Sequence, residues 1–174
     1  MRRLMLLRHA KTERADPGAR DRDRKLTKRG RADAPLIGAY MVRHGLVPDL
    51  ALVSPAERAR ETWQLVAASF AKAPQAVTDE RIYNATADKL MTVLSEPRSA
   101  RSLLVVGHNP GIHDLAVELI ASGEVEARER VAEKLPTSGF VVVDLAFDDW
   151  QLLHAHAGRL DRFVSPRLIA AATE

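Results

Sequence analysis

The chain has 174 residues, of which 46% are hydrophobic and 28% charged, and this is enough for one domain with a core of its own. The absence of cysteine excludes disulfide bonds, cysteine-ligated zinc and a cysteine nucleophile. The formal net charge of +3 and the pI of about 9.5 suit anionic substrates, whereas an aromatic content of 5% argues against a surface that stacks nucleic-acid bases. We therefore expect residues 1–174 to form a single domain that does not bind nucleic acid.

The sequence contains no segment suited to secretion or to a membrane. The apolar run from Leu4 to Leu7 is too short for the hydrophobic region of a signal peptide. No stretch approaches the roughly 20 apolar residues that a membrane-spanning helix needs. We expect a cytoplasmic protein without a membrane partner.

Hydrophobic patterning and capping residues predict alternating strands and helices. Thr27 is a suitable N-cap for the first helix, Gly45 is a suitable stop, and Pro35 is expected to kink the helix between them. Ser54 and Pro55 suit the N-cap and the first position of the next helix. In chain order we expect a strand at 3–7, a polar loop at 10–25, a helix at 27–44, a strand at 50–53, a helix from 54 to about 70, a strand at 76–78, a helix at 86–94, a strand at 102–106, a helix at 111–122, an exposed charged segment at 123–134, a hairpin of strands at 140–145 and 151–155, and a helical turn from 165.

This order of elements indicates the fold class. Strands that alternate with helices are typical of an α/β protein in which helices cover both faces of a parallel sheet. We expect a three-layer α/β/α sandwich with a mainly parallel central sheet, and an antiparallel pair of strands at one edge.

Polar side chains follow three of the expected strands at the point where each strand ends. Arg8 and His9 follow the first strand, Ser54 follows the second, and His108 follows the strand at 102–106. In open α/β sheets the crevice at the carboxyl ends of the strands is where ligands bind. Arg58 lies four residues after Ser54, so both lie on one helix face near its positive end.

The four residues Arg8, His9, Arg58 and His108 are suited to phosphoryl chemistry. Two arginines can hold a phosphoryl group through paired hydrogen bonds, which lysines do less well. A neutral imidazole is a good nucleophile near pH 7, and a second histidine can stabilise the charge on the phosphoryl oxygens or carry a proton. This set needs no metal and no cofactor, and the aspartates lack the clustering typical of a magnesium site.

Three motifs resemble the histidine phosphatase superfamily, which has the phosphoglycerate mutase-like fold. Each follows an expected strand, and they occur in the family's order. The branch that the chain resembles most is that of the short SixA-type phosphohistidine phosphatases. The motifs are Leu7-Arg8-His9-Ala10-Lys11-Thr12, Ser54-Pro55-x-x-Arg58-Ala59-x-x-Thr62 and Val106-Gly107-His108-Asn109-Pro110.

The resemblance implies a role for each matching residue. His9 is implied to be the catalytic nucleophile and to carry the phosphoryl group transiently. Arg8 and Arg58 are implied to bind the phosphate, and His108 to complete the catalytic pocket. Water then attacks phospho-His9, and the substrate is a phosphorylated protein or a small phosphorylated molecule.

The sequence departs from the ester-cleaving members of the family in one respect. Those members carry a glutamate general acid in the middle of the chain, and Glu80 lies in that region without a recognisable motif around it. An alkoxide leaving group needs a proton, whereas an imidazole with a pKa of about 6.5 leaves readily once it is protonated. The missing motif therefore favours phosphohistidine on a protein as the substrate.

Other functions remain open from the sequence. The same chemistry would serve a phosphatase of a small metabolite, and a phosphoglycerate-type mutase is disfavoured because the chain has little room for a specificity insert. A non-catalytic phosphate-binding module and a metal-dependent hydrolase are further alternatives. The other histidines, among them His113, His154 and His156, are expected to have structural roles.

Overall fold

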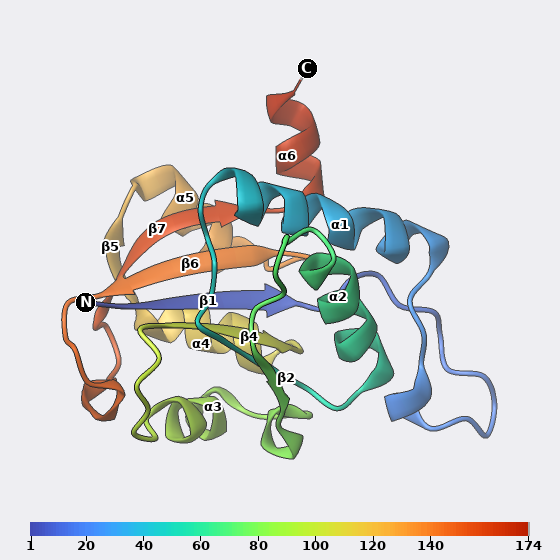
Figure 1. Ribbon diagram of the computed structural model, residues 1–174, viewed down its shortest axis with the longest axis horizontal. Coiled ribbons are helices and arrows are strands. Elements are labelled where there is room, and N and C mark those ends of the chain that lie inside the picture. The colour runs from blue at the N-terminus through green and yellow to red at the C-terminus, as the bar shows by residue number, and fades with distance from the viewer. Residues whose placement is uncertain (174) are drawn as a thin grey trace.

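The computed structural model describes residues 1–173, which build a seven-stranded sheet with helices on both faces (Figure 1). The strands are β1 (Arg2–Arg8), β2 (Leu50–Val53), β3 (Ala76–Thr78), β4 (Ser102–Gly107), β5 (Ile120–Gly123), β6 (Phe140–Leu145) and β7 (Gly158–Val164). The helices are α1 (Lys28–Arg43), α2 (Glu57–Ala67), α3 (Ala87–Leu94), α4 (Gly111–Leu119), α5 (Val125–Glu133) and α6 (Pro166–Ala172), with 3-10 turns η1 (Asp21–Asp23), η2 (Glu80–Ile82) and η3 (Trp150–Leu152). Among residues 1–173, no helix is both long enough and apolar enough to cross a bilayer.

The sheet has the order β3-β2-β4-β1-β6-β7-β5 and is mostly parallel. Strands β3, β2, β4 and β1 pair in parallel, as do β7 and β5. Strand β6 runs antiparallel to both of its neighbours, β1 and β7. The expected α/β sandwich is confirmed, but the reversed strand lies inside the sheet and not at its edge.

Two hydrophobic clusters, one on each face, follow from the alternation of side chains along the strands. In β1, Leu4 and Leu6 belong to the cluster under α3 and α4, whereas Met5 and Leu7 belong to the cluster under α1 and α2. All four side chains are essentially buried. Strands covered on both faces read as continuous apolar runs, and this is why the first strand was predictable.

Capping residues define several helix boundaries as expected. The Thr27 hydroxyl accepts the N–H of Gly30 at the start of α1, and the Ser165 hydroxyl accepts the N–H of Leu168 at the start of α6. Helix α1 runs from Lys28 to Arg43 with Pro35 inside it.

The helix expected from Ser54 begins later in the structure. Its N-cap is Ala56 and its first residue is Glu57. The Ser54 N–H donates to the Val106 carbonyl at 3.0 Å, so Ser54 still continues the pairing of β2 with β4. Its hydroxyl lies 2.6 Å from the Nε2 atom of His108. Ser54 therefore links the sheet to His108 and does not cap α2.

The helix expected at 111–122 is too long by three residues. Helix α4 ends at Leu119, and Ile120–Gly123 forms the edge strand β5 beside β7. Gly123 has φ of +128°, a conformation that favours glycine, and this ends the strand.

The strand expected at 151–155 is wrong. Residues Trp150–Leu152 form the turn η3, and the antiparallel neighbours of β6 are β1 and β7. Trp150 and Leu153 are buried in the same cluster, and the Trp150 indole N–H donates to the Ala100 carbonyl. Their spacing of three residues matches a 3-10 turn and not the two-residue period of a strand. The histidines of this stretch consequently lie in the loop before β7.

Gly30 allows α1 to pack closely on the segment that follows β1. A Cβ at Gly30 would lie 2.3 Å from the carbonyl oxygen of Lys11. We predict that Gly30→Ala lowers the free energy of unfolding by about 1–3 kcal/mol, because the backbone contact cannot relax easily. Urea titration measures this change. Arg29→Ala, one residue earlier at a 74% exposed side chain, is the control and should change stability by less than about 0.5 kcal/mol. Equal unfolding midpoints for the two variants would contradict the steric argument.

Candidate functional site

The candidate site lies where β1, β2 and β4 end. The His9 N–H donates to the Gly107 carbonyl at 3.1 Å, and the Ser54 N–H donates to the Val106 carbonyl at 3.0 Å. These backbone bonds bring the segment after each strand to one edge of the sheet. Helix α2 begins at the same edge (Figure 1).

His9 is buried, and one of its ring nitrogens is held by the backbone. His9 is 8% exposed, and its Nδ1 atom lies 2.8 Å from the Ala10 carbonyl oxygen. A carbonyl can only accept, so the neutral ring carries its proton on Nδ1. The Ala10 N–H is in turn fixed by the Thr62 hydroxyl at 3.0 Å. This arrangement leaves the Nε2 lone pair of His9 available for reaction.

His108 is held through its other nitrogen. The Ser54 hydroxyl accepts the Ala56 N–H at 3.3 Å and lies 2.6 Å from His108 Nε2. The hydroxyl can donate to Nε2 or accept from it, and either bond holds the ring in place. The Nδ1 atom of His108 is buried and has no hydrogen-bond partner in the protein. The His108 ring lies 5.3 Å from that of His9.

Both histidines are neutral at pH 7. Burial, together with the charges of the Arg58 and Arg8 guanidinium groups, lowers the pKa of His9 to about 4, against the hydrogen bond to Ala10. Burial also lowers the pKa of His108 to about 3, with added repulsion from His9 and Arg58. A neutral imidazole is the nucleophilic form, so the site keeps His9 reactive well below its ordinary pKa.

Arg8 and Arg58 both lie near enough to His9 for their charges to lower its pKa. The Arg58 side chain is only 5% exposed, and its two terminal nitrogens donate to the Asp21 backbone carbonyl at 2.8 Å and to Asp21 Oδ2 at 3.0 Å. Arg8 donates one N–H to the Leu135 carbonyl at 3.1 Å. Burial lowers the pKa of Arg8. The structure therefore brings the four predicted site residues together.

Two residues to which the sequence assigned no role also border the site. Asp21 lies in the loop expected to be solvated, but it contacts Arg58 directly. The Tyr83 hydroxyl donates to Asp21 Oδ2 at 2.5 Å, and the Tyr83 ring lies edge-on to His108 with the ring centroids 5.7 Å apart. The segment Tyr83-Asn84-Ala85 is similar to the SixA-type branch, and this similarity is the one sequence signal for Tyr83. Asp21 carried no comparable signal.

Ser138 is also placed beside the site. It is 1% exposed, its N–H lies 3.1 Å from the carbonyl oxygens of both Arg8 and His9, and its hydroxyl has no hydrogen-bond partner in the protein. Across residues 1–173, histidine, aspartate and glutamate side chains do not gather in any group of three that could hold a metal ion. His113 lies outside the site, since its Nε2 atom contacts the Val131 carbonyl and ties α4 to α5.

Comparison with known proteins identifies the family. Residues 4–92 match the model of the histidine phosphatase superfamily, branch 1. The chain belongs to the histidine phosphatase superfamily. A protein of Mycobacterium leprae without an assigned function is 36% identical over 92% of this chain and 100% of its own length.

Solved structures refine the placement within the superfamily. A structure from Agrobacterium tumefaciens, described as a SixA phosphohistidine phosphatase, superposes with a TM-score of 0.81 at 32% identity and covers 95% of this chain and 98% of that chain. The chain is therefore a superfamily member of the SixA type, and this membership supports phosphatase activity. A structure from Escherichia coli, described as an alpha-ribazole-5′-phosphate phosphatase, has a TM-score of 0.68 at 18% identity, with 97% and 99% of the two chains covered. That likeness shows a shared fold alone.

The burial of His9 and His108 predicts a specific dependence of stability on pH. Between pH 6.5 and pH 4 an unfolded histidine binds a proton that the folded ring excludes, so folding loses stability as the pH falls through this window. We expect a loss on the order of a few kcal/mol per ring, complete near pH 4 for His9 and near pH 3 for His108. Urea unfolding at half-unit intervals of pH measures it.

The control for this effect is a variant without the buried ring. His9→Gln should show a shallower loss of stability between pH 6.5 and pH 4 than the unmodified chain. His154→Gln, at an exposed histidine, should keep the full slope. Equal slopes for all three proteins would show that the buried rings do not cause the loss of stability as the pH falls.

Proposed function

We propose that this protein is a metal-independent phosphatase that removes phosphate from phosphohistidine on a protein through a phospho-His9 intermediate. The single observation that carries the proposal is the state of His9: a buried, neutral imidazole with Nδ1 bonded to the Ala10 carbonyl and with Nε2 free. The neighbouring guanidinium groups of Arg8 and Arg58 complete an anion-binding pocket around it, together with His108 Nδ1, which has no partner in the protein and carries the ring proton in this mechanism.

In the first step, His9 Nε2 attacks the phosphorus atom of the substrate. The substrate phosphoimidazole carries a proton on its other ring nitrogen, so when its bond to phosphorus breaks the imidazole takes the electron pair and leaves as a neutral ring. Arg8 and Arg58 bind the phosphoryl oxygens by charge-assisted hydrogen bonds, and the His108 N–H donates to one of them. In the second step, water attacks phosphorus, the bond to His9 Nε2 breaks, and inorganic phosphate is released.

The carboxylates that border the pocket favour a nitrogen leaving group. Hydrogen bonds from Tyr83, Arg24 and Arg58 hold the pKa of Asp21 far below its ordinary value, so Asp21 remains ionised and has no proton to donate. Glu80 is 72% exposed and its carboxylate is bonded to the Arg22 guanidinium at 3.0 Å. Phosphohistidine needs a general acid less than a phosphoester does, because protonated imidazole leaves readily.

Substitution of His9 tests the mechanism. We predict that His9→Ala loses phosphohistidine phosphatase activity by a factor of about 10³ or more, because it removes the nucleophile. The assay measures phosphate release from a phosphohistidine peptide by EDTA-treated protein. His154→Ala makes the same change at an exposed histidine and should retain full activity. Retention of activity in His9→Ala would rule out the mechanism, and loss of wild-type activity on EDTA treatment would rule out metal independence.

A substrate panel tests the leaving group. We predict that kcat/KM for a phosphohistidine peptide exceeds that for sugar phosphates, nucleotides and other small phosphoesters by about tenfold or more, since the ionised Asp21 cannot assist an alkoxide. Faster turnover of a small phosphoester would retain the His9 chemistry and assign a metabolite as the substrate. Binding of phosphate without turnover of any compound would indicate a non-catalytic module.

A further inference from the structure

An anionic side chain lies against Arg58. Both terminal nitrogens of the guanidinium donate to a single residue, Asp21, through the backbone carbonyl at 2.8 Å and through Oδ2 at 3.0 Å. Arg58, the predicted phosphate ligand, therefore has both terminal nitrogens bonded to another group of the protein.

Asp21 is fixed by other contacts and not by Arg58 alone. The Tyr83 hydroxyl donates to Asp21 Oδ2 at 2.5 Å, and Arg24 donates to Oδ1 at 3.1 Å. The Tyr83 ring lies edge-on to His108, so the carboxylate is tied to the other side of the pocket as well. The two contacts orient the carboxylate toward Arg58.

A second anion at Arg58 changes the energetics of phosphate binding. A guanidinium has five N–H donors, of which Asp21 uses two, so a phosphoryl group must either share the remaining donors or displace the carboxylate. Sharing places two anions on one cation, and displacement of the carboxylate breaks its hydrogen bond to Arg58. Asp21 is 46% exposed and belongs to the exposed turn η1, which leaves displacement sterically open. Either route weakens binding of phosphate relative to a free arginine.

We propose that Asp21 is a positioning residue that also competes with phosphate for Arg58: it holds the guanidinium in the binding orientation and limits the affinity of the pocket for its inorganic phosphate product. This inference rests on the proposed function, because it takes Arg58 as a ligand of the phosphoryl group. Limited affinity for phosphate benefits turnover. An interaction that binds the substrate and the phosphate product equally strongly does not speed the reaction and slows release of the product.

The test measures binding of inorganic phosphate, and of tungstate as a phosphate mimic, by isothermal titration calorimetry. We predict that Asp21→Asn, which removes the charge and keeps the shape, binds both anions about tenfold more tightly at low ionic strength. Tyr83→Phe keeps the ring beside His108 and removes one bond to the carboxylate, so it should tighten binding in the same direction by a smaller factor.

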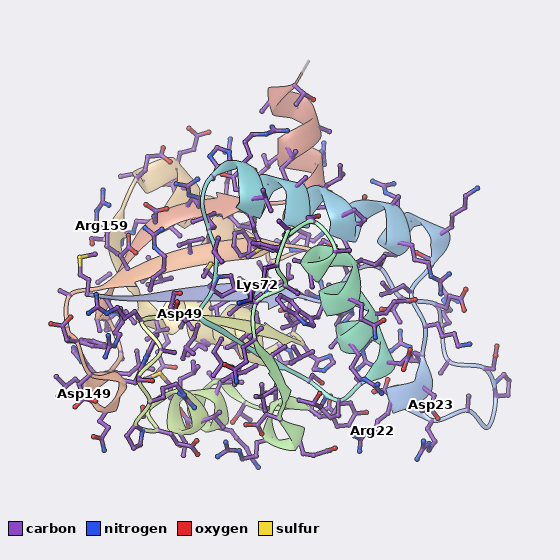
Figure 2. All side chains as sticks on the ribbon, viewed as in Figure 1. Arg22, Asp23, Asp49, Lys72, Asp149 and Arg159 are labelled. Carbon is purple, nitrogen blue, oxygen red and sulfur yellow. The ribbon has the colours of Figure 1, made fainter. Side chains whose placement is uncertain are left out.

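A matched control lies two residues away. Asp23→Asn makes the same change of charge in the same turn, but Asp23 is bonded to Arg20 at 2.9 Å and not to Arg58. Figure 2 shows Asp23 and Arg22 on η1, beside the N-terminal end of α2. We expect Asp23→Asn to change the dissociation constants by less than about twofold under the same conditions, because an exposed charge without a contact to Arg58 acts on the site through water.

The outcomes separate this inference from the proposed function. Tighter binding in Asp21→Asn but not in Asp23→Asn supports competition. Unchanged or weaker binding in Asp21→Asn overturns it, because a residue that only positions Arg58 would lose affinity when removed. Equal tightening in both variants also overturns it and assigns the effect to net charge. Failure of the unmodified protein to bind either anion contradicts the proposed function itself. Thermal unfolding monitored by circular dichroism verifies that each variant is folded.

Discussion

The site depends on the register of the parallel pairing between β1 and β4. In this register Arg8 lies opposite Gly107, so that His9 and His108 are the next residue on each strand. Because side chains alternate between the faces of a sheet, a shift of one residue would move Leu4, Leu6 and their neighbours to the wrong core cluster. The two hydrophobic cores therefore hold the register, and the register in turn holds the rings 5.3 Å apart. Packing far from the pocket is thus the cause of its geometry.

Burial then determines the chemical state of the pocket. Removal of water disfavours the charged form of an imidazole, and the two arginines nearby disfavour it further. The same cations attract a phosphoryl group, so one arrangement of charge keeps the nucleophile neutral and binds the anion that it attacks. The hydrogen bond from His9 Nδ1 to the Ala10 carbonyl leaves the Nε2 lone pair of His9 free, and the Ser54 hydroxyl holds the His108 ring through Nε2. The Nδ1 atom of His108 has no partner in the protein.

Local signals in the sequence were sufficient for much of this arrangement. The apolar run before Arg8 and the glycine before His108 mark strand ends, and strand ends meet at one edge of a parallel sheet. The alternation of strands and helices was enough to predict the three-layer sandwich. Features that depend on tertiary packing could not be predicted locally. Trp150 and Leu153 are core residues at a three-residue spacing, whereas the sequence predicts a strand at 151–155. Serine is a typical residue for a helix N-cap, but the Ser54 hydroxyl is hydrogen-bonded to His108, 54 residues away.

The contact between Asp21 and Arg58 shows most clearly why the remainder could not be predicted. The two residues are 37 positions apart, and the alternating charges around Asp21 are also what a solvated loop would have. A buried guanidinium is costly without a partner, so the fold must provide an anion for Arg58. It supplies that anion from η1 and fixes it through Tyr83 and Arg24. The stability of the fold and the affinity for phosphate are then linked through one guanidinium, because the carboxylate that pairs with Arg58 is also the group with which phosphate must compete.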